Sequence, residues 1–133
     1  MISVRRMKTK EHGKPVLHIL VVDDEPTVRD SIKMLLEHFG HTVQTADNGA
    51  AALALVEPGR FQLVITDYFM HGMKGDELAA LIKAREPGLP IIMATAFVDE
   101  LKASGKLDGN VDDLLIKPFS LTDLREAIAR VVR

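Results

Sequence analysis

The sequence predicts an α/β domain in which a five-stranded parallel sheet lies between two layers of helices. Short apolar runs alternate with segments of helical periodicity, which is the pattern of successive βαβ units. The length of 133 residues favours one domain large enough to bury a core, and the apolar fraction of 47% is ordinary for a globular protein. No internal repeat or low-complexity segment interrupts the alternation.

Five apolar runs bounded by turn signals are predicted to form the strands, at residues 17–22, 41–46, 61–66, 90–94 and 111–116. The helices are predicted at residues 26–39, 49–56, 76–85, 98–104 and 121–131. Pro26 suits a first helical turn, Asn48 and Ser120 are N-cap residues, and Gly40 is a C-terminal stop. The segment 98–104 is the weakest helix, because Gly105 and an Asp-Gly turn follow it; we expect it to be short or mobile.

Composition excludes several classes of protein. The absence of cysteine excludes a disulfide framework and thiol chemistry, and it suits the cytoplasm. The chain contains neither a secretory signal nor an apolar run approaching the roughly 20 residues that span a bilayer, so no membrane association is expected. The net charge of −2 predicts no direct binding to nucleic acid.

Residues 1–15 carry five basic side chains and a single acidic one. We interpret them as a flexible leader or a remnant of cloning, and residues 16–133 as the folded domain. The alternative is a basic arm that contacts a phosphate group or an acidic partner.

Polar residues follow four of the predicted strands. Asp23 and Asp24 follow the first, Asp67 the third, Thr95 the fourth and Lys117 the fifth. Ligands bind at the carboxyl ends of the strands in open parallel sheets, so these side chains are expected to meet in one crevice. Three neighbouring carboxylates are unfavourable without a counterion, and Mg²⁺ is a hard cation that resolves this.

The stretch Asp67-Tyr68-Phe69-Met70-His71-Gly72-Met73-Lys74-Gly75, together with the other strand-end residues in this order, resembles the receiver domain of two-component response regulators. The resemblance runs from about residue 16 to residue 133. It implies a flavodoxin-like doubly wound sheet of strand order 2-1-3-4-5, flanked by five helices.

The resemblance also implies a role for each site residue. Asp67 would be the phosphoacceptor, attacking a phosphohistidine of a partner protein. Asp24, Asp67 and the backbone carbonyl of Phe69 would hold Mg²⁺ directly, and Asp23 would act through a metal-bound water. Thr95 would donate a hydrogen bond to the phosphoryl group and act as a switch. Lys117 would neutralise charge, aimed inward by a cis peptide to Pro118.

As a member of this family the chain would be a signalling switch rather than an enzyme, although it would catalyse its own phosphorylation and dephosphorylation. Its partners would be a sensor histidine kinase or a histidine phosphotransfer protein, and a downstream protein or fused output domain. A homodimer through residues 98–104, 111–116 and 121–131 is also possible. The chain is either a stand-alone receiver or one cut from a longer regulator or hybrid kinase.

Two departures from the family pattern bear on function. His71 stands where proline is usual, and we interpret it as a tolerated loop change or as an extra titrating group near the site. Leu114 stands where the family has the switch residue tyrosine or phenylalanine, so coupling to the rest of the domain is expected to be looser. In the family, the side chains at the positions of Phe69 and Phe97 shape the approach of the water that hydrolyses the phosphoryl group. The resemblance therefore implies slow hydrolysis here; the alternative is that both rings are surface contacts for a partner.

Two other functions compete with this interpretation. A small Mg²⁺-dependent aspartyl phosphatase also uses an aspartate nucleophile, but Phe69 stands where such enzymes place a second aspartate. A scaffold receiver would signal without phosphorylation; the intact Asp67, Thr95 and Lys117 oppose it, whereas Leu114 is compatible with it.

Overall fold

The computed structural model describes residues 15–104 and 109–132. The predicted leader, apart from residue 15, lies outside the described residues, as do Gly105 and Asp108 of the turn signals. Within the described part of the chain no helix is long and apolar enough to cross a membrane.

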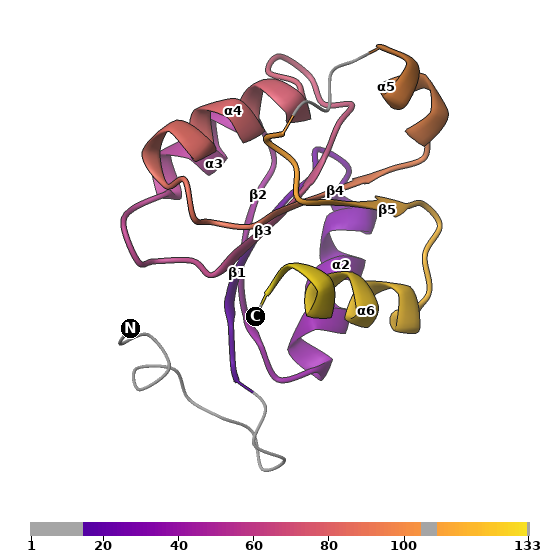
Figure 1. The fold of residues 1–133 in the computed structure, drawn as a ribbon. Helices are drawn as coiled ribbons and strands as arrows, with labels where there is room; N and C mark the ends of the chain where they lie inside the picture. Colours follow the sequence, from indigo (N-terminus) through magenta and orange to yellow (C-terminus); the bar gives the residue numbers. More distant parts are fainter. Residues whose placement is uncertain (1–14, 105–108, 133) are drawn as a thin grey trace.

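All five strands are parallel and hydrogen-bonded in the order β2-β1-β3-β4-β5 (Figure 1). The strands are β1 (His18–Val22), β2 (Thr42–Ala46), β3 (Leu63–Asp67), β4 (Ile91–Thr95) and β5 (Asp113–Ile116). The predicted fold class and strand order are therefore confirmed. β1 and β3 lie side by side at the centre, so the residues that follow them share one edge of the sheet.

The helices begin and end within about two residues of their predicted bounds. They are α2 (Pro26–His38), α3 (Gly49–Leu55), α4 (Gly75–Arg85), α5 (Val98–Ser104) and α6 (Leu121–Val131). Both predicted N-caps are confirmed: the Asn48 side chain accepts from the Ala51 amide at 2.8 Å, and the Ser120 hydroxyl accepts from the Asp123 amide at 3.0 Å. Gly40, just beyond α2, has a φ of 96°, a backbone conformation that would be strained in any residue with a side chain.

Two hydrophobic cores lie on the two faces of the sheet. One packs α2 and α6 against it, around residues such as Leu36 and Leu124. The other packs α3 and α4 against the opposite face, around residues such as Ala52 and Leu78. Figure 1 shows these helix pairs on opposite sides of the strands, which is the three-layer arrangement that the sequence predicts.

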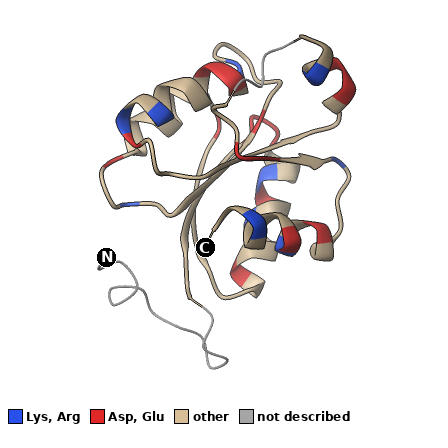
Figure 2. Cartoon of the chain, viewed as in Figure 1, with Lys and Arg blue, Asp and Glu red and all other residues tan. Residues whose placement is uncertain are grey.

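α4 places its charges as the helix dipole favours. Asp76 and Glu77 lie in its first turn and Lys83 and Arg85 in its last, as the red and blue ends of this helix show in Figure 2. The Glu77 side chain also accepts from the Lys74 amide at 3.1 Å, which fixes the start of the helix. α4 therefore begins at a defined point, directly after the loop that follows Asp67.

A third and smaller cluster lies beneath α5. Its buried members are Tyr68, Met93 and Leu101, against which Val111 and Leu114 pack. α5 buries only Val98 and Leu101, so this cluster provides much of what attaches the helix to the sheet.

Candidate functional site

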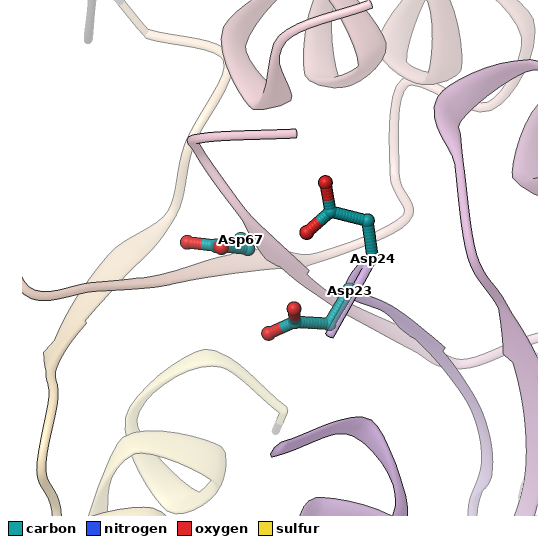
Figure 3. Close-up of side chains that lie close together, drawn as sticks. All are labelled: Asp23, Asp24 and Asp67. Carbon is teal, nitrogen blue, oxygen red and sulfur yellow. The ribbon is translucent and has the colours of Figure 1, made fainter. Parts of the chain in front are cut away.

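Three aspartates meet where β1 and β3 end. Asp23 and Asp24 directly follow β1, and Asp67 is the last residue of β3; the ligand oxygens of the three lie within 4.8 Å of one another. Figure 3 shows the three side chains at the adjoining ends of these strands. The convergence predicted from the strand ends is thus present for the three acids.

Lys117 lies between two of these carboxylates. Its ammonium donates to Asp23 Oδ2 at 2.8 Å and lies 3.5 Å from Asp67 Oδ2. The peptide bond that follows Lys117 is cis, as predicted. Asp23 is buried, and its other carboxylate oxygen accepts from the Glu25 amide at 3.0 Å. Both oxygens of Asp23 are therefore already paired with the protein, which suits a group that acts on a metal through water.

The surroundings of Asp67 disfavour ionisation of its carboxyl group. Burial raises the pKa of its carboxyl, and the negative charge of Asp23 raises it further. The Lys117 ammonium and the hydrogen bond from the Tyr68 amide, 2.8 Å from Asp67 Oδ1, act in the opposite direction without cancelling the rise. A cation placed among these acids would complete the neutralisation that Lys117 begins.

Asp24 has a different environment because of His71. Burial raises the pKa of Asp24, but hydrogen bonds from His71 outweigh it and leave the pKa below its usual value. The His71 amide donates to Asp24 Oδ2 at 3.0 Å, and Nδ1 of the ring lies 2.8 Å from the same oxygen. The residue that replaces proline in the loop therefore contacts the predicted metal ligand directly, which sequence reasoning did not foresee.

Thr95 lies at the end of β4 and is fully buried. Its Oγ1 accepts from the Phe97 amide at 3.1 Å. The Phe97 carbonyl accepts in turn from the Leu101 amide at 3.1 Å, so Phe97 caps the first turn of α5. The predicted switch residue is thus bound to the start of the helix that follows it.

The loop after Asp67 is closed tightly at both ends. The Gly75 amide donates to the Tyr68 carbonyl at 2.9 Å. A Cβ at Gly75 would stand 2.8 Å from Tyr68 Cα and would also meet the Asp67 carbonyl oxygen, so only glycine fits there. This explains physically why a glycine stands eight residues after Asp67.

Phe69 and Phe97 contact each other beside the site. Their rings lie edge to face with centroids 5.0 Å apart, and each side chain is about half exposed, at 44% and 48%. Phe69 also meets the Tyr68 ring at 4.6 Å. Three aromatic rings therefore run from the buried cluster under α5 to the surface near Asp67.

A family comparison decides how these residues are to be interpreted. The model of the response regulator receiver domain matches residues 19–129, which is most of the chain. The chain belongs to the receiver-domain family.

Curated relatives of this receiver include both short and long proteins. It is 35% identical over 118 residues to the chemotaxis protein CheY-3 of Vibrio cholerae, a match that covers 86% of this chain and 91% of CheY-3. It is 36% identical over 108 residues to the transcriptional regulatory protein TcrA of Mycobacterium tuberculosis, covering 81% of this chain. The matched part makes up only 43% of TcrA.

Solved structures similar to the receiver include two that contain magnesium. The response regulator TrrA of Thermotoga maritima, in complex with Mg²⁺ and BeF, has a TM-score of 0.79 at 33% identity, covering 86% of this chain and 98% of TrrA. The receiver domain of the sensor histidine kinase PA1611 of Pseudomonas aeruginosa, with a magnesium ion in its active-site cleft, has a TM-score of 0.80 at 26% identity, covering 87% and 97%.

The donor set of this receiver fits magnesium. The three carboxylates offer hard oxygen ligands within one ion's reach, and Mg²⁺ takes one or two carboxylates and completes its shell with water. Asp24 and Asp67 would hold the ion, and Asp23, whose two oxygens are paired, would support a water ligand. The role of the Phe69 carbonyl stays a prediction.

The site residues named from the sequence fall into two groups in the receiver. Asp23, Asp24, Asp67 and Lys117 form one connected cluster. Thr95 contacts Phe97, and Leu114 lies in the cluster under α5 with Tyr68. No sequence pattern indicates that Tyr68 would occupy this cluster, because a lone tyrosine after a strand is equally compatible with a surface position.

Proposed function

We propose that this receiver accepts a phosphoryl group from a phosphohistidine on a partner protein onto Asp67, with Mg²⁺, and thereby changes its contacts with other proteins. The observation that carries the proposal is the cluster of three carboxylates and the Lys117 ammonium around the carboxyl group of Asp67. Phosphoryl transfer needs alignment and charge neutralisation more than it needs covalent chemistry from the protein.

In the proposed step an oxygen of the Asp67 carboxylate attacks the phosphorus of the donor phosphohistidine. The new P–O bond forms as the P–N bond breaks, and the electron pair of that bond returns to the imidazole nitrogen. The products are an aspartyl phosphate and a free histidine. Hydrolysis by water later releases inorganic phosphate and restores the carboxylate, so the chain acts on itself and turns over no separate substrate.

The chain's own residues prepare this step. The Tyr68 amide holds Asp67 Oδ1 at 2.8 Å, which leaves Oδ2, on the side of Lys117, to attack. The Lys117 ammonium, 3.5 Å from Oδ2, neutralises charge on the phosphoryl oxygens once they arrive. When bound, Mg²⁺ supplies a second positively charged group, beside the Lys117 ammonium, to neutralise the transferring group. Thr95 donates its hydroxyl to a phosphoryl oxygen after the transfer.

The partners in this proposal are a sensor histidine kinase or a histidine phosphotransfer protein as donor, and a downstream protein or a fused output domain as target. The similarity to the receiver of a sensor histidine kinase and to stand-alone chemotaxis proteins supports both arrangements. A homodimer through α5, β5 and α6 would be a further form of output.

The test is phosphorylation by a small donor. Incubation with acetyl phosphate and Mg²⁺ is expected to add one phosphoryl group, detected by intact mass. Asp67→Asn should abolish it, Asp24→Ala or omission of Mg²⁺ should nearly abolish it, and Asp30→Asn, at an exposed position on α2, should leave it unchanged.

Other outcomes separate the alternatives. A wild-type chain that takes up no phosphoryl group under these conditions would support a scaffold receiver that signals without phosphorylation. Rapid turnover of unrelated phosphate esters would support the aspartyl phosphatase. Phosphorylation that persists in Asp67→Asn would contradict the assignment of the acceptor.

A further inference from the structure

Asp24 is bound by His71, which lies 47 positions further along the chain, in the loop between β3 and α4. The His71 amide donates to Asp24 Oδ2 at 3.0 Å, and ring Nδ1 lies 2.8 Å from the same oxygen. The pKa of Asp24 lies below its usual value, so the carboxylate is ionised at neutral pH and can only accept. Nδ1 therefore carries the hydrogen, and two donors of one residue meet on one oxygen.

The amide donor exists because this residue is not proline. Proline, which the resembling family usually has at this place, carries no backbone N–H. Its side chain offers no donor either, so a receiver with proline here could make neither hydrogen bond. Both contacts with Asp24 therefore come from this chain's own sequence and not from the general pattern of receivers.

The backbone on either side of His71 is anchored. Met70, directly before it, is 2% exposed and belongs to the core that packs α3 and α4 against the sheet. Met73, two residues after it, lies so close to α3 that a Cβ at Gly49 would stand 2.7 Å from its sulfur. The His71 side chain itself is fully exposed to solvent. The loop thus holds the amide in place, whereas water competes for the hydrogen bond of the ring.

Each of the three acids accepts a hydrogen bond from a backbone amide, but the amide that donates to Asp24 comes from a distant part of the chain. The Glu25 amide donates to the acid two residues before it, and the Tyr68 amide donates to the acid directly before it. These two donors accompany their acids in any receiver that has this backbone. The orientation of Asp24, in contrast, depends on which residue stands at position 71.

The two hydrogen bonds leave Asp24 Oδ1 for a cation. In the described part of the chain no other residue donates to Oδ1, while Oδ2 receives both hydrogen bonds from His71. A carboxylate held at one oxygen keeps its plane, so less orientational freedom is lost when a cation binds the other oxygen. Carboxylate ligands of metal ions are themselves hydrogen-bonded, and the loss of such a partner typically costs about 10–100-fold in metal affinity.

We propose that His71 is a positioning residue of the metal site, whose amide and ring hold the Asp24 carboxylate in the orientation in which Oδ1 binds Mg²⁺. The inference rests on the proposed function, in which Mg²⁺ occupies this site, and it adds the residue that prepares one of the ligands. The amide contributes more than the ring, because the loop fixes the amide and the ring is exposed to water. If His71 instead had to leave Asp24 before the cation entered, its removal would strengthen binding.

The test is metal affinity in the absence of any phosphodonor. Mn²⁺ takes the same oxygen ligands as Mg²⁺, and its free ion is measured by electron paramagnetic resonance, so Mg²⁺ affinity follows by competition. His71→Ala, which keeps the amide, should raise the Kd about threefold, and His71→Pro, which removes both donors, at least about tenfold. His71→Asn, whose side-chain N–H can replace Nδ1 without a titrating group, should stay within about twofold of the wild type.

Two further variants frame these measurements. Asp24→Ala should nearly abolish binding and so identify the site. The matched control is His38→Ala, at an exposed histidine in the last turn of α2, which should leave the Kd unchanged. A Kd that falls in His71→Ala or His71→Pro would show that His71 competes with the cation and would overturn the proposal.

Hydrogen exchange followed by NMR gives a second readout. The His71 amide should be protected in the metal-free protein and stay protected at saturating Mg²⁺, because Asp24 keeps this hydrogen bond while it binds the ion. At least about tenfold faster exchange on addition of Mg²⁺ would refute the proposal. The Gly75 amide, which donates to the Tyr68 carbonyl, reports whether the loop keeps its shape in each variant. If His71→Pro loses that protection, the comparison of His71→Ala with His71→Asn decides alone.

The failures of the two proposals differ in these measurements. Mg²⁺-dependent phosphorylation of Asp67, with equal metal affinities in the wild type, His71→Ala and His71→Pro, would overturn the role of His71 and leave the proposed function standing. Affinity that falls in His71→Ala and recovers in His71→Asn, in a protein that takes up no phosphoryl group, would overturn the proposed function and support the positioning role.

Discussion

Asp67→Asn should make the metal-free protein more stable, because the negative charge of the partly buried Asp67 carboxylate destabilises the fold when no cation is bound. Asparagine is nearly isosteric with aspartate, and its side-chain oxygen can still accept from the Tyr68 amide. The substitution therefore removes one negative charge while it keeps the packing and this hydrogen bond.

The size of the effect follows from the distances. With an effective dielectric constant of about 20, the repulsion from Asp23 across 4.8 Å costs about 3.5 kcal/mol. The attraction of Lys117 at 3.5 Å returns about 4.7 kcal/mol. These two interactions largely offset each other, so the cost of burying the Asp67 carboxylate, which is the largest influence on its pKa, decides the sign. We expect a gain of about 1–3 kcal/mol in the free energy of unfolding, which raises Tm by about 3–5 °C per kcal/mol.

The assay is urea denaturation at low ionic strength, without Mg²⁺, for the wild type, Asp67→Asn and the exposed control Asp30→Asn. Because the pKa of Asp67 is raised in the folded protein, the ionised carboxylate lowers the free energy of unfolding at neutral pH. Protonation removes this destabilisation as the pH falls through the raised pKa of Asp67. The difference between Asp67→Asn and the wild type should therefore shrink on acidification, and Mg²⁺ should shrink it at neutral pH. An Asn variant less stable than the wild type at neutral pH would refute the reasoning.

Three more substitutions test other parts of the site. His71→Ala should raise the pKa of Asp24 part of the way toward its usual value, measured by NMR titration of the metal-free protein, because it removes the ring contact and keeps the amide hydrogen bond. The resulting loss of stability should shrink as the pH falls through that pKa, and an unchanged pKa would mean that the ring has no influence. Lys117→Met should cost about 3–5 kcal/mol in the free energy of unfolding, since it leaves the buried Asp23 charge unpaired, and adding Asp23→Asn should recover much of the loss. Phe97→Glu should speed loss of phosphate from the loaded protein by about tenfold, because a carboxylate can orient the attacking water; equal decay rates would assign the ring to partner recognition instead.

The fold was predictable because local signals and periodicity agreed at almost every element. Asn48, Ser120 and Gly40 act where their chemistry predicts, and α5 has the bounds that were expected from the turn signals after it. The convergence of the acids was predictable for a different reason. It follows from strand order alone, since residues that end adjacent parallel strands must share one edge of the sheet.

The contacts of His71 and Tyr68 were not predictable in the same way. Loop geometry determines whether the amide and ring of a residue such as His71 reach a carboxylate from another strand. The burial of Tyr68 depends on where α5 lies, and the sequence of that helix specifies its position only weakly. Both contacts belong to tertiary structure around irregular backbone, where periodicity carries no information.

The hydrogen bond from the Gly75 amide to the Tyr68 carbonyl, together with the close approach of these two residues, fixes both ends of the loop between them; this arrangement is called the closure here. Asp67 is positioned by β3 and the closure, and α4 starts from its own capping interaction at Lys74. Changes within this loop would therefore act through its side chains, such as the buried Met70 and the His71 ring beside Asp24, and would leave the backbone of Asp67 in place. Sequence variation here would alter the surroundings of the predicted metal ligand while the predicted acceptor keeps its position.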